Sequence, residues 1–290
     1  MQKHVLTVTS AERDAELASL LVARLQLSAA AARSWIAGGS VSLDGRRCTA
    51  AETRLSPGQR VVVYEPREDD AVAPPLLVYR DEALAVLDKP AGLPSQATRR
   101  GGTATVEDFL RAELGAEARL AHRLDAAASG LLLVTRSATA RQAIAAQLRQ
   151  GTLARVYLAI VEGVPREPRL LIRSRLGVRG GRTRSSGDGR ARLAETCACL
   201  LRVNEAGDRA LLQVQLSTGR THQIRAHLAE HGLPLVGDGL YGGPPAPRLA
   251  LHAHHLRLLH PSRHDLLELH SPLPAPLRAM LSDRESRGAV

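Results

Sequence analysis

The first part of the chain places apolar residues at the spacing of a helix. Leucines recur every three or four residues: Leu17, Leu20, Leu21 and Leu25. This period predicts a helix over residues 11–24 that Ser10 can cap, because a short hydroxyl side chain accepts a hydrogen bond from a free N–H of the first turn. Ser28 can cap a second helix that reaches Ile36. We therefore expect two short helices at the start.

The period then changes to that of short strands. Val41-Ser42-Leu43 alternates, and Asp44-Gly45 after it is a strong signal for a hairpin turn. Pro57-Gly58 then precedes an apolar run at residues 61–64. The first part thus reads as helix, helix, then small strands.

Residues 65–75 mix charged side chains with prolines, which block both helix and central strand, and so have the composition of a linker. We predict a small domain at residues 1–65, a linker at 66–75 and a larger domain at 76–290. Strand and helix patterns are interspersed in the larger domain, so its expected class is α+β. Strands are expected at 84–87, 131–134, 156–161 and 211–216, and helices at 106–114, 139–148 and 222–231.

The net charge of +10 belongs entirely to the larger domain. Residues 1–70 carry nine basic and nine acidic side chains, whereas residues 71–290 carry 30 basic and 20 acidic ones. Only two of the 39 basic residues are lysine, so codon bias alone can account for the abundance of arginine. The position of the excess charge nevertheless predicts that the larger domain binds a polyanion.

Compartment signals predict a cytoplasmic protein without a membrane partner. No stretch approaches the roughly 20 consecutive apolar residues of a membrane helix, and the first residues lack the features of a secretory signal. Cys48 stands alone, while Cys197 and Cys199 would point to one face of a strand. A disulfide framework is therefore not expected.

The most informative polar segment is His122-Arg123-Leu124-Asp125, which precedes small residues and an apolar run at 131–134. An acid in a tight loop before a core strand is held rigidly. Taken alone, the segment could equally be a structural loop in which Asp125 caps a turn.

With its neighbours, this segment resembles the RluA family of pseudouridine synthases, whose motif reads His-Arg-Leu-Asp, two residues, Thr-Ser-Gly and an apolar run. Further matches, in the family's order, are Lys89-Pro90-Ala91-Gly92-Leu93-Pro94, residues 155–163 and residues 218–225. The likeness spans about residues 76–270. It implies a pseudouridine synthase fold, with a central mixed, mainly antiparallel sheet and flanking helices, and an isomerase that converts uridines of structured RNA to pseudouridine without a cofactor or a metal.

The same resemblance implies three catalytic residues. Asp125 would carry out the chemistry, as nucleophile or as base. Tyr157 would stack on the target base, although a strand tyrosine could instead belong to the core. Arg220 would form an ion pair with Asp125, although it could instead cap a helix and touch phosphate.

Five residues are implied in substrate binding: His122, Arg123, Arg225, Leu249 and Leu251. Arg123 would fill the space that a flipped base vacates, or else contact a phosphate. Leu249 or Leu251 would pack on the uracil face, although leucines in such strands usually belong to the core.

The chain departs from the family pattern at two positions. Ala128 replaces the usual threonine, and Arg155 replaces the usual lysine before Tyr157. The missing hydroxyl removes a hydrogen bond worth about 0.5–1.5 kcal/mol, so we still expect activity. Residues 166–192 hold nine arginines against two acidic residues, which predicts a basic, mobile arm that binds RNA phosphates, or else an exposed loop.

Residues 12–64 resemble the alpha-L RNA-binding module of a small-subunit ribosomal protein, on the segments 28–36 and 39–45. Ala29-Ala30-Ala31-Ala32 stands where that family usually has basic residues, so a docking domain is an alternative. The expected partner is ribosomal or transfer RNA rather than DNA, and the expected state is a monomer.

Two rival functions remain open from the sequence. One is a non-catalytic RNA-binding protein that kept the fold. The other is a metal-dependent hydrolase built from the C-terminal histidines, but these lack the His-Glu-x-x-His pattern and read as scattered surface and strand residues.

Overall fold

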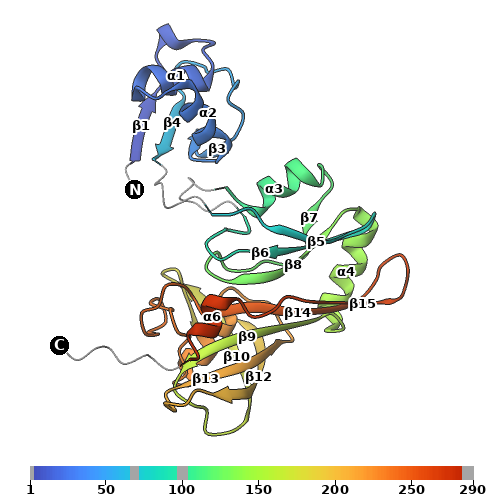
Figure 1. Cartoon of the computed structure of the whole chain (residues 1–290). Helices are drawn as coiled ribbons and strands as arrows, with labels where there is room; N and C mark the ends of the chain where they lie inside the picture. The colour runs from blue at the N-terminus through green and yellow to red at the C-terminus, as the bar shows by residue number, and fades with distance from the viewer. Residues whose placement is uncertain (1–2, 66–71, 97–103, 283–290) are drawn as a thin grey trace, which may run out of the picture. The chain divides into compact units, whose positions relative to one another are not determined.

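The computed structural model describes residues 3–65, 72–96 and 104–282, shown as thick ribbon in Figure 1. The chain forms two compact units. The first combines Met1–Pro74 with Leu93–Glu113, and the second combines Pro75–Gly92 with Leu114–Val290. Residues 93–113, which lie inside the larger predicted domain, thus group with the first unit.

The first unit is a small sheet with short helices. Its elements are β1 (Lys3–Thr7), η1 (Ser10–Glu12), α1 (Leu17–Leu25), α2 (Ala29–Ala37), β2 (Val41–Leu43), β3 (Arg46–Cys48), β4 (Arg60–Tyr64) and α3 (Val106–Glu113). The four strands are antiparallel in the order β1-β4-β2-β3. Leu17, Leu21 and Ile36 are fully buried against Val61 and Val63, which closes one apolar core.

Local chemistry explains where the helix predictions held and where they were wrong. The first helix begins at Leu17 and not at residue 11, because Thr9 and Glu12 form a capping box around a separate 3-10 turn and Asp14 then has a φ of 58°. The strand β1 before it was not predicted. Ser28 does cap α2, by accepting a hydrogen bond from Ala31 N at 3.1 Å. Asp44-Gly45 does form the β2–β3 turn.

The second unit is built on an eleven-stranded sheet. Its strands are β5 (Leu76–Arg80), β6 (Leu84–Lys89), β7 (Arg119–Leu120), β8 (Ser129–Thr135), β9 (Ala154–Glu162), β10 (Arg169–Arg179), β11 (Arg182–Ser185), β12 (Arg192–Val203), β13 (Arg209–Leu216), β14 (Leu251–Leu259) and β15 (Leu266–His270). Its helices are α4 (Ala138–Gln150), α5 (Gln223–Glu230) and α6 (Ala275–Ala279). The mixed, mainly antiparallel sheet with flanking helices confirms the predicted fold class.

The main path through this sheet runs β11-β10-β12-β13-β9-β14-β8-β6-β5. Among the described strands, β14 and β8 form the parallel pair, and the other pairs are antiparallel. Gly130 makes that pairing close: its φ is +107°, and a Cβ there would lie 2.2 Å from the carbonyl oxygen of Ala253. The close approach fixes the loop before β8 beside the start of β14.

The helices cover the sheet through apolar contacts. Ala140 and Ile144 of α4 pack with Leu131 and Leu133 of β8 in one buried cluster. None of the described helices is long and apolar enough to span a membrane. The pairs β10–β11 and β10–β12 account for most of the arginine-rich segment, which is therefore hairpin structure rather than a loop.

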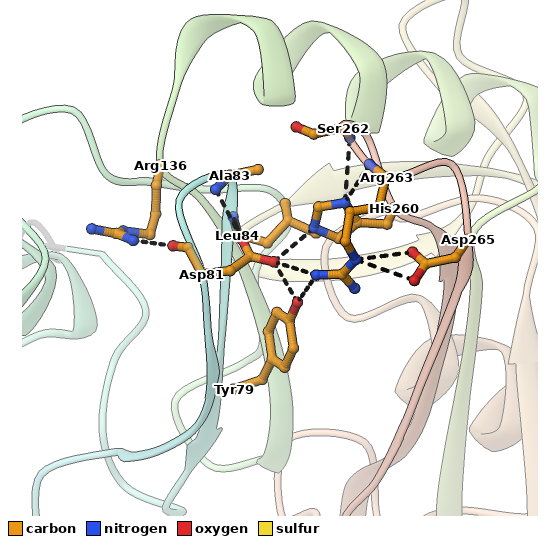
Figure 2. A network of polar contacts seen from close by, with 9 residues as sticks. All are labelled: Tyr79, Asp81, Ala83, Leu84, Arg136, His260, Ser262, Arg263 and Asp265. Carbon is orange, nitrogen blue, oxygen red and sulfur yellow. Dashed lines mark hydrogen bonds and ion pairs between the residues drawn. The ribbon is translucent and has the colours of Figure 1, made fainter.

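A polar network ties the β5–β6 turn to the β14–β15 turn (Figure 2). Asp81 Oδ1 accepts hydrogen bonds from the backbone N–H of Ala83 and of Leu84, both at 2.8 Å. Its Oδ2 accepts from Tyr79, from His260 Nε2 at 2.8 Å and from Arg263 Nη1 at 3.0 Å. Partial burial of Asp81 opposes ionisation, but these hydrogen bonds outweigh it and lower the pKa of Asp81 to about 2.

Candidate active site

Asp125 lies in a short loop between β7 and β8 that is held from several sides. Its own carbonyl accepts a hydrogen bond from Ala128 N at 3.1 Å, and Gly92 N donates to Ala126 O at 2.7 Å. Lys89, at the end of β6, donates from Nζ to Ala126 O at 3.1 Å and to Ala128 O at 2.6 Å. The lysine therefore stabilises the loop conformation directly.

Lys89 is fully buried, a rare position for a lysine unless its hydrogen bonds are satisfied. Burial lowers the pKa of Lys89 to about 7, with the charge of Asp125 opposing the shift and that of Arg248 adding to it. The role of this side chain depends on its contacts with the loop at residues 126–128, which the sequence around Lys89-Pro90 does not predict.

An arginine bridges Asp125 to a second, buried carboxylate. Arg225 on α5 donates from Nη1 to Asp125 Oδ2 at 3.2 Å. It also donates from Nε and Nη2 to the two oxygens of Asp238, each at 2.7 Å. The side chain of Asp238 is fully buried and that of Arg225 is 10% exposed, whereas that of Asp125 is 24% exposed. The bidentate pair with Asp238 therefore fixes the position and the plane of the guanidinium, and the guanidinium in turn orients the more accessible Asp125.

Two aromatic side chains complete this arrangement. The guanidinium carbon of Arg225 lies 5.0 Å from the ring centroid of Tyr241, within the range of a cation–π contact. The hydroxyl of Tyr241 accepts from Thr183 N at 2.8 Å and lies 3.1 Å from His222 Nδ1. His222 Nε2 is 3.9 Å from Asp125 Oδ2, and burial lowers the pKa of His222. Neither aromatic residue was assigned a role from the sequence.

The ion pair predicted for Arg220 is corrected by these contacts. Arg220 is exposed, and its Nε donates to the carbonyl oxygen of Leu193 at 3.1 Å. It lies before α5, and Gln223 Oε1 accepts from its backbone N–H at 3.0 Å, so the side chain leaves the loop toward β12. Arg225, which we had expected to bind substrate, is the arginine that contacts Asp125.

The other residues of the His122–Asp125 motif point in different directions. His122 Nε2 accepts a hydrogen bond from Leu133 N at 3.2 Å, and burial lowers the pKa of His122 to about 3. The neutral ring thus secures the motif to β8, and this contact was not expected from the sequence. Arg123 is exposed, as a residue that reaches RNA has to be, but its predicted role stays a prediction.

The remaining predicted residues are buried around β9 and β14. Tyr157 is 5% exposed and pairs in register with Ala253 and Val214, and burial, together with the charge of Asp125, raises its pKa. Leu249 and Leu251 are 3% and 4% exposed. Tyr157 and the two leucines thus belong to the buried interior around β9 and β14, and their roles toward a substrate stay predictions.

Three of the C-terminal histidine and acidic side chains meet across the β14–β15 hairpin. The potential ligand atoms of His255, Glu268 and His270 lie within 4.8 Å of one another, so these histidines are not scattered as we had read them. The rings of His255 and His270 are stacked at 4.3 Å with an interplanar angle of 4°. Nε2 of His255 lies 2.7 Å from Glu268 Oε1 and Nε2 of His270 lies 3.8 Å from the same oxygen, so both stacked rings face one carboxylate.

The geometry places one oriented carboxylate, partly open to solvent, beside a fixed arginine. Such a carboxylate can add to an electrophilic carbon or remove a proton. Its orientation is set by Arg225, and through Arg225 by Asp238. The sequence singled out Asp125 and Tyr157, whereas the positioning roles of Lys89 and Asp238 required the tertiary structure.

Comparisons with known proteins place this geometry in context. A family model described as RNA pseudouridylate synthase matches residues 83–230. The chain is 34% identical over 278 residues to an uncharacterized RNA pseudouridine synthase of Synechocystis, covering 88% of this chain and 84% of that protein. It is 34% identical over 291 residues to the ribosomal large subunit pseudouridine synthase D of Nitrosomonas europaea, covering 92% and 83%.

A solved structure shows the same fold. The human RNA pseudouridylate synthase domain containing 1 superposes with a TM-score of 0.57 at 26% identity, over 72% of this chain and 86% of that chain. The residues matched by the family model include Asp125, Tyr157 and Arg225, whereas Asp238 lies beyond them.

Proposed function

This chain belongs to the RNA pseudouridylate synthase family, and from that premise we propose that it isomerises specific uridines of large-subunit ribosomal RNA, with Asp125 as the catalytic carboxylate. An isomerase of this class breaks the bond from the ribose to the ring nitrogen and joins ring carbon five to the same sugar carbon. The hydrogen on ring carbon five leaves as a proton and the ring nitrogen gains a proton, so the product is an isomer of the substrate and nothing is oxidised. An oriented carboxylate can act in such a reaction as nucleophile or as base.

The observation that carries the proposal is the contact between Asp125 and Arg225. The bidentate pair with Asp238, at 2.7 Å on both oxygens, limits the positions that the guanidinium can take, and the 3.2 Å hydrogen bond transfers that limit to Asp125. Holding a reacting group in one geometry is a large part of catalysis, because the entropy of positioning is lost before the reaction begins. Asp125 would attack the sugar as a nucleophile or initiate the removal of a sugar proton as a base.

A uridine in folded RNA reaches Asp125 only after it leaves its stack, so the proposal includes base flipping. Arg123 is exposed in the loop that carries Asp125 and would occupy the vacated space. Tyr157 would stack on the flipped base. Leu249 or Leu251 would pack on its other face.

The surface that would hold the RNA backbone is the hairpin region of β10, β11 and β12. Eight of the nine arginines at residues 166–192 are exposed, the exception being the half-buried Arg182. Arginines on a strand surface bind phosphates with little sequence preference, which fixes the RNA without choosing the uridine. Large-subunit ribosomal RNA is favoured over transfer RNA by the name of the Nitrosomonas europaea relative.

The test is carbodiimide mapping of pseudouridine in unmodified transcripts of large-subunit ribosomal RNA and of transfer RNAs, each incubated with purified protein. We expect new reverse-transcription stops in the ribosomal transcript with the wild type and none with Asp125→Asn. Asp265→Asn, which removes an exposed charge paired with Arg263, is the matched control and should retain the stops. Stops confined to transfer RNA would overturn the substrate, and stops retained by Asp125→Asn would overturn the catalytic assignment.

A further inference from the structure

Arg248 lies just before β14 and reaches the loop that carries Asp125. Its Nη2 donates to Ser129 Oγ at 2.6 Å, and Ser129 begins β8, four positions after Asp125. Ser129 Oγ in turn lies 2.8 Å from His252 Nδ1. The guanidinium is thus held beside the candidate active site by a neutral hydroxyl.

Within the described residues, Arg248 has no acidic side chain within the 4.0 Å of an ion pair, unlike Arg225 with its two carboxylates. Its Nε is buried and makes no hydrogen bond, and Nη1 takes part in none either in the described part of the chain. The side chain is only partly exposed, and burial lowers the pKa of Arg248. A partly buried cation without a counter-ion is costly, unless a ligand supplies the negative charge.

The other charges nearby do not satisfy this guanidinium. Lys89 is itself a donor, which gives its hydrogen bonds to the carbonyl oxygens of Ala126 and Ala128, so it supplies no negative charge to Arg248. The carboxylates of Asp238 and Asp125 are already bonded to Arg225. Among the described residues, the contact made by the guanidinium of Arg248 is therefore the one with the neutral hydroxyl of Ser129, and an anion would complement its charge.

We propose that Arg248 binds a phosphodiester group of the RNA next to the target nucleotide, with Nη1 as the donor that the fold leaves available. The inference rests on the proposed function, because it takes the bound anion to be part of the RNA substrate. An arginine fork suits a phosphate better than a lysine does, since two parallel N–H groups match two phosphate oxygens. The adjacent Leu249 would face the base while Arg248 holds the backbone, so that both come from one short segment.

The alternative is that Arg248 acts only through Ser129, by holding the start of β8. The two roles differ in what removal of the hydroxyl does. Ser129→Ala deletes the 2.6 Å hydrogen bond and keeps the positive charge, whereas Arg248→Gln deletes the charge and keeps a side chain that can hydrogen-bond. Only a phosphate contact changes the salt dependence of RNA binding, because only it releases a counter-ion.

The experiment measures the affinity of the full chain for a large-subunit ribosomal RNA transcript between 50 and 300 mM salt, in the Asp125→Asn background so that no product forms. With Arg248→Gln added, we expect about tenfold weaker binding at low salt and a slope of log affinity against log salt that is smaller by about 0.7–0.9. Arg248→Lys should restore most of the slope. Ser129→Ala and the exposed Arg278→Gln, a charge-matched control, should leave the slope unchanged.

Three outcomes would overturn the proposal: an unchanged slope with Arg248→Gln, equal effects of Arg248→Gln and Ser129→Ala, or an equal effect of Arg278→Gln. Circular dichroism of each variant checks that it is folded, and Arg248→Lys tests the charge where glutamine disturbs packing. The result is separable from the proposed function. If the wild type makes no pseudouridine but Arg248→Gln still reduces the slope, the phosphate contact stands and the assigned reaction fails.

Discussion

Replacing Asp238 with asparagine tests whether a buried carboxylate controls Asp125 through the guanidinium of Arg225. Asp238 is fully buried and receives two charge-assisted hydrogen bonds of 2.7 Å from Arg225. Asparagine has nearly the same shape, but its amide group offers one acceptor and turns an NH₂ toward the second N–H of the guanidinium. One hydrogen bond is therefore lost, and Arg225 loses one of its two neutralising carboxylates.

The size of the effect follows from burial. Breaking a buried ion pair by removing one partner costs about 3–5 kcal/mol, because the remaining charge stays away from water. Arg225 retains one contact with Asp125, so we expect a loss near the lower limit, about 3 kcal/mol. The guanidinium is also freed to shift, and a displacement of about 1 Å at a positioning group can reduce kcat by roughly 10²-fold with less change in KM.

The assay is urea unfolding followed by far-UV circular dichroism, together with single-turnover pseudouridine formation under conditions in which the variant is folded. The matched control is Glu195→Gln, which removes the partly exposed partner of the exposed Arg173 from a pair at 2.9 Å. Such pairs contribute less than about 1 kcal/mol, so the control should unfold almost as the wild type does. A loss for Asp238→Asn no greater than that of the control, or an unchanged kcat, would refute the reasoning.

Three further predictions concern the loop and the scaffold. Gly130→Ala should lower the free energy of unfolding by more than about 3 kcal/mol or prevent folding, because its Cβ would lie 2.2 Å from Ala253 O. Gly151→Ala is the control: no atom lies within 4 Å of its Cβ, so the loss should be about 1 kcal/mol. Thermal or urea unfolding measures both losses. Burial lowers the pKa of Lys89 to about 7, so above that pH the folded chain binds fewer protons than the unfolded chain. The free energy of unfolding should therefore rise by about 3 kcal/mol between pH 7 and 9.5. Urea unfolding of Lys89→Met, measured over the same pH range, should lack that rise. Hydrogen bonds lower the pKa of Asp81 to about 2, so the stability that Asp81 contributes is present above about pH 4 and is lost as the pH falls toward 2. This contribution to the free energy of unfolding is on the order of 1 kcal/mol after allowance for solvent screening. Acid unfolding of Asp81→Asn should lack it.

Local sequence determined much of this protein. The α+β class, the Ser28 cap and the Asp44-Gly45 turn follow from hydrogen bonds and backbone preferences within a few residues, and sequence analysis predicted each of them. The family follows from motif order, and the position of Asp125 before a buried strand was read from the apolar run that follows it. The extent of the first helix was predicted wrongly because Thr9 and Glu12, competing at equally short range, form a separate turn.

Tertiary structure decided what the motifs touch. Arg220 and Arg225 occur in one segment, and only the packing of α5 against β12 and β11 determines that Arg225 reaches Asp125 while Arg220 turns away. Asp238 pairs with Arg225, 13 positions away in the chain, and Lys89 bonds Ala128, 39 positions away, and no periodicity in the sequence predicts either contact. Side-chain direction and burial are set when distant strands pair, so basic residues that look equivalent in the sequence have different roles. Arg225 forms a buried ion pair, Lys89 holds a loop, and Arg248 has no carboxylate partner among the described residues.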